Sequence, residues 1–193
     1  MAVDLGDLRG PFTFESTSVD EGLVSLRYRI GTDLVLTETV KFPFALPDTD
    51  AVARLIHVLH LVVGVSYYKT VAPVPLVAPP LTKAERALVV RLYDDGLREF
   101  AYRNDISLPL PVQIEADDAA EPASAEPAGH GALVPIGGGK DSALVAALVP
   151  DGELFAVNPV GAQDDLAEAL GRPLVGAHRT LDPVLRELNE RGA

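Results

Sequence analysis

The 193-residue chain has no cysteine, so it forms no disulfide, binds no metal through thiolates and carries out no chemistry through a protein thiol. Basic residues are few, 16 against 28 acidic ones, and the net charge of −12 disfavours a surface that holds a nucleic-acid backbone. No uninterrupted apolar run reaches the roughly 18 residues that span a bilayer, and the N-terminus lacks the features of a signal peptide. We therefore expect a cytoplasmic protein that binds neither nucleic acid nor membrane and acts on a small or nucleotide-linked substrate.

Hydrophobic residues make up 48% of the chain, enough to bury a core, and their spacing predicts an N-terminal α+β domain over residues 1–114. Apolar and polar residues alternate first, as in strands, and then recur at helical spacing. The expected elements are an antiparallel hairpin over 23–30 and 34–37, a helix from an N-cap at Asp48 to Gly64, and a helix from a Thr82–Glu85 capping box to about Asn104.

Residues 115–131 are acidic, contain alanine and proline, and include no aliphatic side chain larger than alanine, which predicts a disordered linker. Beyond it, residues 132–193 alternate short apolar strands with helices, which is typical of parallel β-α-β units. The expected strands are 132–136, 154–158 and 174–177, followed in turn by helices 142–149, 164–170 and 183–191. The fold class predicted for the whole chain is α/β, an α+β region followed by part of a parallel-sheet domain.

The first strand of the second domain runs directly into a glycine-rich loop and a helix. The loop consists of Gly137, Gly138, Gly139, Lys140, Asp141 and Ser142. Glycines let the chain turn tightly and let a ligand approach the backbone, while the free amides and dipole of a helix N-terminus favour an anion. A strand-to-helix turn without a ligand is the alternative, but three glycines in register with lysine, aspartate and serine favour phosphate binding.

The spacing of the loop distinguishes between kinds of phosphate site. A Walker A loop needs glycine at Val134 and serine or threonine at Asp141, and a dinucleotide fingerprint lacks its third glycine because Ser142 stands there. The loop instead resembles the Ser-Gly-Gly-x-Asp-Ser signature of N-type ATP pyrophosphatases, with Gly137 in place of the serine. That resemblance implies cleavage of ATP to AMP and pyrophosphate, with AMP transferred to a carboxylate, amide or urea oxygen.

A second segment, Gly-Val-Ser-Tyr-Tyr-Lys at residues 64–69, follows the first long helix. Together with the loop and the C-terminal stretch it resembles the UDP-N-acetylmuramoyl-L-alanyl-L-glutamate epimerase family of the PP-loop superfamily. The resemblance implies that ATP and Mg²⁺ are used to invert the terminal L-glutamate of a UDP-linked muramoyl dipeptide for peptidoglycan synthesis. Adenylation would remove the carboxylate charge that otherwise keeps the α-proton from leaving.

Candidate general bases are Lys69, Tyr67 and Tyr68. Two alternatives stay open: the tyrosines pack in the core with Lys69 solvated at a helix end, or the three side chains bind carboxylates or the diphosphate of the substrate. Asn158 follows the second parallel strand, where α/β folds collect ligands, and is a candidate on the adenosine side. Arg179 could meet a phosphate, although an exposed arginine is the commoner case. No metal ligand is assigned.

Two other functions fit the same loop: another PP-loop ATP pyrophosphatase or amide ligase, or a module that binds a nucleotide without turning it over. A dinucleotide-binding oxidoreductase would need an acidic residue where Asn158 stands.

Pyrophosphatase domains of this kind resemble five-stranded sheets, whereas residues 132–193 supply three strands. We therefore expect a catalytic domain that stops early, as a fragment, a split gene whose partner polypeptide completes the sheet, or a degenerate protein. In this expectation the third strand is left as an exposed edge, and the chain alone has little activity.

Overall fold

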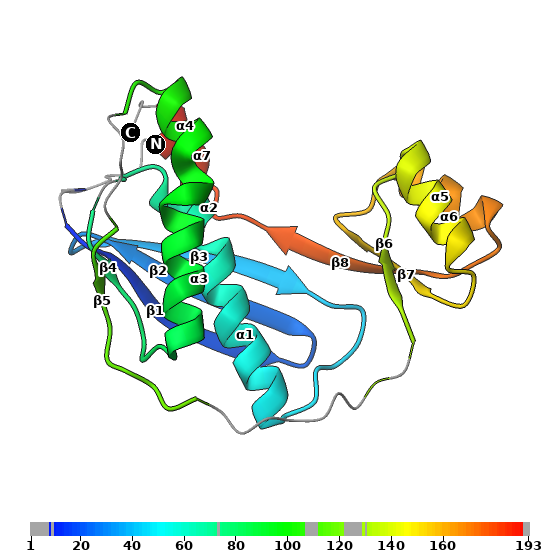
Figure 1. Ribbon diagram of the computed structural model, residues 1–193, viewed down its shortest axis with the longest axis horizontal. Coiled ribbons are helices and arrows are strands. Elements are labelled where there is room, and N and C mark those ends of the chain that lie inside the picture. Colours follow the sequence, from blue (N-terminus) through cyan, green and yellow to red (C-terminus); the bar gives the residue numbers. More distant parts are fainter. Residues whose placement is uncertain are drawn as a thin grey trace.

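The computed structural model of the chain describes residues 8, 10–72, 74–106, 112–121, 129 and 131–190. Their strands form a mixed sheet in the order β5-β4-β1-β2-β3-β8-β7-β6 (Figure 1). The strands are β1 Phe12–Asp20, β2 Leu23–Ile30, β3 Leu34–Lys41, β4 Leu76–Val77, β5 Ile114–Glu115, β6 Leu133–Pro135, β7 Glu153–Val157 and β8 Leu174–Thr180. The α-helices are α1 Asp50–Val63, α2 Val65–Tyr68, α3 Lys83–Tyr93, α4 Arg98–Arg103, α5 Lys140–Leu148, α6 Gly161–Ala169 and α7 Val184–Glu190. The prediction of a mixed α/β fold is confirmed.

The first three strands form an antiparallel meander that contains the expected hairpin. Ile30 pairs with Leu34 across the turn between β2 and β3, and β1 lies on the other side of β2. Side chains of β2 and β3 alternate between the buried face and the outer face, as the sequence pattern predicts. The helices α1 and α3 cover the buried face (Figure 1), and the core between them is rich in aromatic rings: Phe12, Phe14, Tyr28, Tyr67, Tyr68 and Tyr93.

Helix α1 differs from the prediction at its start, whereas its C-cap is Gly64 as predicted. Its N-cap is Thr49 rather than Asp48, because the Thr49 hydroxyl accepts a hydrogen bond from the backbone N–H of Val52 at 3.3 Å. At the other end Gly64 keeps helical geometry, with φ −56°, and α2 follows at once. A Cβ atom at Gly64 would lie 2.7 Å from the Tyr93 hydroxyl, so the missing side chain lets this junction sit directly on the aromatic core.

Helices α1 and α2 together, residues Asp50–Tyr68, would be long and apolar enough to cross a membrane by length and composition alone. This is weak evidence, because a core helix of a globular protein passes the same test. Ile56, His60 and Leu61 of α1 are buried against the sheet. The stretch therefore serves, in this structure, as a layer over the N-terminal strands.

Helix α3 begins with the predicted capping box, in which Thr82 and Glu85 exchange hydrogen bonds with each other's backbone. The single helix expected to reach Asn104 is interrupted, however, by a 3₁₀ turn over Asp95–Leu97. Aspartate and glycine in that turn have low helix propensity, which is the local reason for the break. Helix α4 then resumes and ends at Asn104, as expected.

The segment predicted as a linker begins as ordered chain. Strand β5 pairs in parallel with β4, and the bridge between Leu81 and Asp118 continues the contact. Glu121 then accepts a hydrogen bond from the N–H of Lys83, the first residue of α3, at 3.0 Å. Acidic side chains at this point face a helix N-terminus, where negative charge is favoured. Residues 122–128 and 130 of the predicted linker lie outside the described part of the chain.

The C-terminal half follows the predicted strand–helix alternation. Strands β6, β7 and β8 pair in parallel, and α5 and α6 lie between them in sequence. Helix α7 begins at Val184, one residue later than predicted, and the carboxylate of Asp182 just before it accepts a hydrogen bond from Val184 N–H at 2.9 Å. The expected end of this helix, at residue 191, lies outside the described residues.

Strand β8 corrects the expectation of an exposed third strand. Its first part, at Leu174–Ala177, pairs with β7, and its last part, at His178–Thr180, pairs antiparallel with β3 of the N-terminal meander. The two predicted domains therefore share one sheet, and Figure 1 shows β8 running from one to the other. The strand at the end of the sheet is β6 instead, the strand that leads into the glycine-rich loop.

Candidate functional site

The glycine-rich loop lies between β6 and α5. Gly138 has φ +79°, in the left-handed region, and a Cβ atom there would lie 2.8 Å from the Cβ of Ala162 in α6. A Cβ at Gly137 or Gly139 would meet nothing within 4 Å. Glycine is thus required at the central position, while the space over the two flanking glycines is open.

The N-terminus of α5 is open as well. Gly139 is its N-cap, and no side chain caps this helix among the described residues. The Ser142 hydroxyl donates to the Gly139 carbonyl at 2.9 Å, and Lys140 and Asp141 are exposed. The N–H groups of the first turn therefore have no side-chain acceptor among the described residues, and such an open helix N-terminus favours an anion.

Asn158 follows β7 at the same carboxyl edge of the parallel strands. It has φ +50°, and its side-chain amide makes two hydrogen bonds to the backbone of Arg179. The Nδ2 atom donates to the Arg179 carbonyl at 3.0 Å, and Oδ1 accepts from the Arg179 N–H at 2.7 Å. In this structure the amide joins the ends of β7 and β8; its contact with adenosine stays a prediction.

Tyr67 and Tyr68, two of the candidate bases, are fully buried in the N-terminal core. The Tyr67 hydroxyl accepts a hydrogen bond from Asp182 N–H at 3.0 Å, and the Tyr68 hydroxyl donates to the Val74 carbonyl at 3.1 Å. Burial raises the pKa of both phenols above the usual value, which keeps them neutral. Their surroundings match the core-packing alternative. Lys69, the third candidate, is half-buried and forms no ion pair with any described residue.

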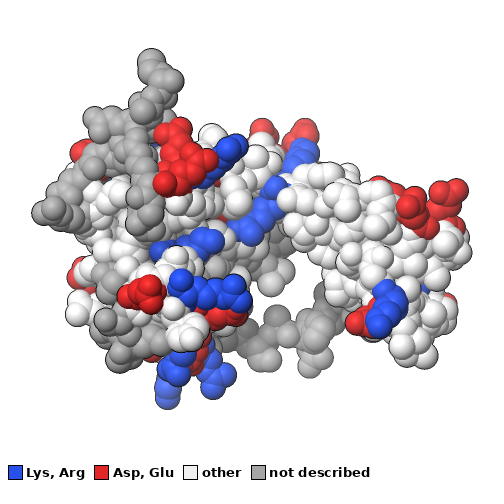
Figure 2. All heavy atoms as spheres, turned by 90° about the horizontal axis from the view of Figure 1, so that it is seen from above, with Lys and Arg blue, Asp and Glu red and all other residues white. Residues whose placement is uncertain are grey.

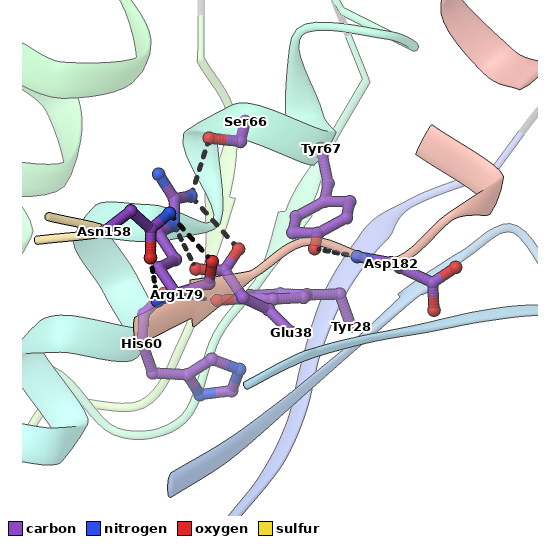
Figure 3. A network of polar contacts seen from close by, with 8 residues as sticks. All are labelled: Tyr28, Glu38, His60, Ser66, Tyr67, Asn158, Arg179 and Asp182. Atoms are coloured by element: carbon purple, nitrogen blue, oxygen red, sulfur yellow. Dashed lines mark hydrogen bonds and ion pairs between the residues drawn. The ribbon is translucent and has the colours of Figure 1, made fainter. Parts of the chain in front are cut away.

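A partly buried ion pair lies between the two halves of the molecule, and the sequence analysis did not predict it (Figure 3). The side chain of Glu38 on β3 is 0% exposed, and that of Arg179 on β8 is 29% exposed. Arg179 Nε lies 2.5 Å from Glu38 Oε1, and Arg179 Nη2 donates to Glu38 Oε2 at 3.1 Å and to the Ser66 hydroxyl at 3.0 Å. Three segments far apart in the sequence, β3, α2 and β8, therefore meet at one guanidinium.

The hydrogen bond with Glu38 raises the pKa of Arg179, although its burial acts in the opposite direction. The negative charge of Glu38 also contributes, after burial, to the raised pKa of Tyr28, whose ring stacks on Tyr67 at a centroid distance of 5.0 Å. A signal for Glu38 was present in the sequence. It occupies an inward position in the alternation of β3, where the neighbouring inward residues are apolar.

The two histidines of α1 play packing and surface roles. His60 is buried, its Nε2 lies 3.0 Å from the Arg27 carbonyl, and desolvation lowers its pKa to about 4. His57 lies 3.7 Å from Glu85 on the neighbouring helix. Within the described residues, no three histidine, aspartate or glutamate side chains are grouped so as to hold a metal ion.

Charge is unevenly distributed over the described surface. Figure 2 shows basic side chains gathered in a band that reaches toward the junction of the two halves, in a chain whose net charge is −12. The phosphate-type loop follows the carboxyl end of β6 and Asn158 follows that of β7, whereas Arg179 lies within β8 where that strand pairs with β3. In open α/β sheets ligands bind at this carboxyl edge, and the exposed Lys140 is the positive charge that lies within the loop itself.

Comparisons with known proteins place this geometry in context. The family model described as the MurL N-terminal domain matches residues 7–193. The chain is 39% identical over 165 residues to the UDP-N-acetyl-alpha-D-muramoyl-L-alanyl-L-glutamate epimerase of Salinispora tropica, which covers 80% of this chain and 36% of that protein. It is 38% identical over 199 residues to the epimerase of the same name from Micromonospora sp., and 37% identical over 199 residues to that of Xanthomonas oryzae pv. oryzae. Each of these two alignments covers 94% of this chain and 44% of the relative.

The chain thus spans less than half the length of the curated relatives it matches. No solved structure matches it.

Proposed function

Because the chain belongs to the MurL N-terminal domain family, we propose that it is the ATP-binding part of a peptidoglycan precursor epimerase. In this proposal the complete enzyme inverts the terminal L-glutamate of UDP-N-acetylmuramoyl-L-alanyl-L-glutamate. The printed names of the three relatives support the substrate and the reaction class. Such a precursor enzyme would act in the cytoplasm, without nucleic acid or membrane as a partner.

The observation that carries the proposal is the open glycine-rich loop in front of an uncapped helix. A left-handed glycine in close contact with α6, two flanking glycines with free space and an exposed lysine fit a polyphosphate better than a structural turn. The backbone N–H groups of Lys140, Asp141 and Ser142 would hold the phosphates of ATP. When bound, ATP would supply an activating group for the α-carboxylate, and Mg²⁺ would be carried mainly by the phosphates.

Proton transfer at the glutamate Cα is assigned to Lys69 in this proposal, since the hydroxyls of Tyr67 and Tyr68 are buried and already hydrogen bonded. The two tyrosines would then position α2, and so Lys69, on the aromatic core. Asn158 would approach the adenosine side of the nucleotide. A second function is favoured by the short coverage of the relatives: the chain alone would bind ATP and would become catalytic only with the rest of the enzyme.

The loop is tested by ATP titration calorimetry with a matched pair of lysine variants. Lys140 and Lys83 are both exposed and both occupy the first position of a helix, but the N-terminus of α3 is capped by Thr82 and Glu121 whereas that of α5 is open. Lys140→Ala is expected to weaken ATP binding about tenfold, as loss of a charge-assisted hydrogen bond would. Lys83→Ala is expected to have no effect. Equal affinities of both variants and the unsubstituted chain would remove the loop from the proposal.

A second pair tests the glycine geometry. Gly138→Ser introduces a Cβ in contact with Ala162 at a left-handed residue and should abolish ATP binding, whereas Gly137→Ser restores the usual serine of the resembled signature in open space and should retain it. A separate assay distinguishes the enzyme from a nucleotide-binding module. Pyrophosphate release is measured with and without the UDP-linked dipeptide, for the chain alone and for the chain together with the part of a relative that it does not span. Release that depends on the dipeptide indicates the enzyme, whereas ATP binding without release indicates the module.

A further inference from the structure

Strand β6 pairs with β7 on one side and with no other strand in the described part of the chain. Ile136 N–H donates to the Phe155 carbonyl at 2.8 Å and the Ala132 carbonyl accepts from Glu153 N–H at 2.8 Å, so the backbone groups of the even-numbered residues face β7. Backbone groups alternate along a strand, and those of Leu133 and Pro135 therefore face away from the sheet. This edge offers the Leu133 N–H and two carbonyls, because Pro135 has no N–H.

Helix α5, which packs on β6, has an apolar surface of its own. Ala146 is buried, but Leu144 is 60% exposed and Leu148 is 72% exposed, one turn apart on the same face, with exposed Val145 beside them. Leu133 on β6 is 59% exposed as well, on the face of the strand opposite to Val134, which is buried with Ala146 of α5. Single exposed apolar residues are common on protein surfaces, whereas three neighbouring ones on α5, a helix that packs on the strand at the end of the sheet, are typical of an interaction surface.

The position of the loop gives this edge a functional meaning. In chain order β6, β7 and β8 lie successively farther from the free edge, so among the strands that the structure describes, the one carrying the loop has neighbours on one side only. Open parallel sheets bind their ligands in the crevice where the strand order reverses, which requires strands on both sides of the first one. A strand on the free side of β6 would create that crevice beside Gly137–Ser142.

We propose that the free edge of β6 and the apolar face of α5 receive a strand–helix unit from the part of the enzyme that this chain does not span. More than half the length of the relatives is available to supply it, since the chain covers 36–44% of them. A second copy of the chain fits less well, because two β6 edges would contribute one N–H donor each and a proline each. Docking of this unit depends on the free strand edge and on the apolar face of α5, and it does not depend on a bound nucleotide.

The test uses a chimera in which the 193-residue chain is continued by the part of the Micromonospora relative that lies beyond the matched stretch. Hydrogen exchange is expected to slow at the Leu133 amide and in α5 of the chimera, relative to the chain alone, without ATP. Unchanged exchange at these sites in a folded chimera would overturn the proposal.

Substitutions make the same test independent of exchange data. Leu144→Glu with Leu148→Glu should leave the melting temperature of the 193-residue chain unchanged, since both side chains are exposed, and should lower that of the chimera by several degrees. Leu55→Glu, at a residue that is 69% exposed on α1, is the control and should be neutral in both.

A co-expressed, separate polypeptide of the same missing part provides the second measurement if the chimera does not fold. It should co-purify with the chain and be released more than about tenfold faster from the double variant. The proposal is contradicted if the two polypeptides do not co-purify, or if both forms of the chain release the partner equally fast. It is also contradicted if the 193-residue chain forms a dimer that the double substitution dissociates, because the apolar face would then bind a second copy.

Discussion

The two halves of the molecule are built on cores of different kinds. The N-terminal half buries large side chains between a meander and two helices, with six aromatic rings in contact. The buried cluster of the C-terminal half consists of small and aliphatic residues: Val134, Ile136, Ala146, Leu154, Ala156 and Ala167. The larger cluster also includes Ala177 of β8 and Leu185 and Leu188 of α7, so the last strand and the last helix pack on the N-terminal core. Buried apolar area is the main stabilising term of a fold, so we expect the larger cluster to contribute more to stability than the smaller one. The phosphate-type loop lies next to the smaller cluster, between β6 and α5.

The largest effect is expected at the ion pair that joins the halves. Arg179→Leu leaves the buried Glu38 carboxylate without its partner and should lower the free energy of unfolding by about 3–5 kcal/mol. The double variant Glu38→Leu/Arg179→Leu should regain much of this loss, because neither charge then remains buried. Urea denaturation of the three proteins measures the difference. Additive losses in the double variant would mean that the two residues stabilise the junction independently.

Matched truncations in each core should separate the halves. Leu36→Ala and Leu154→Ala both remove a fully buried leucine side chain, at a cost of about 2–5 kcal/mol each. We expect Leu36→Ala to lower the stability of the whole molecule and Leu154→Ala to raise hydrogen exchange mainly in β6, α5 and β7. Equal protection losses throughout the sheet in both variants would show that the two halves unfold as one unit.

A pH dependence is expected from the N-terminal half through His60. Its pKa is about 4 in the folded chain and near 6.5 when unfolded, so the unfolded state binds more protons between these values. Stability should be unaffected by this group above pH 6.5 and should fall as the pH is lowered toward 4, by roughly 2–3 kcal/mol. The measurement is the pH dependence of unfolding for the chain and for His60→Gln, which removes the titration; parallel curves would exclude His60 as the cause.

The smallest effects concern the helix N-termini, which differ between the halves. Thr82→Ala removes the hydroxyl of the capping box of α3 and should cost about 1 kcal/mol. Gly139→Asp places a capping carboxylate at the uncapped α5 and should stabilise the C-terminal half by a few tenths of a kcal/mol while it weakens ATP binding. Thermal unfolding and ATP titration of both variants measure the two quantities; stronger ATP binding by Gly139→Asp would contradict an anion site there.

Local signals predicted the elements of the fold well. The alternation of β2 and β3, the Thr82–Glu85 box and the β-α-β rhythm after residue 132 depend on neighbouring residues, and the structure contains all three. The antiparallel pairing of β8 with β3 could not be read from local pattern, because it joins residues about 140 positions apart in sequence. Because β3 pairs with β8, the free edge of the C-terminal strands lies at β6 and not at β8.

The candidate site shows the same contrast between what local sequence predicts and what only the tertiary structure reveals. The loop from Gly137 to Ser142 is continuous in sequence, and its spacing alone predicted an anion site between a strand and a helix. Glu38, Ser66 and Arg179 come from three separate elements, so their meeting required the tertiary structure. The inward phase of Glu38 in its strand was the one local hint.

Strand β8 also restricts how the sequence can vary. Its seven residues pair with β7 over the first part and with β3 over the second. The inward and outward alternation of its side chains must therefore fit the faces of both neighbouring strands. Insertion or deletion of a single residue near Ala177 would turn Arg179 to the opposite face, away from Glu38, while the pairing with β7 stayed intact. Length variation among relatives should therefore fall before Leu174 or after Asp182, and not within the strand.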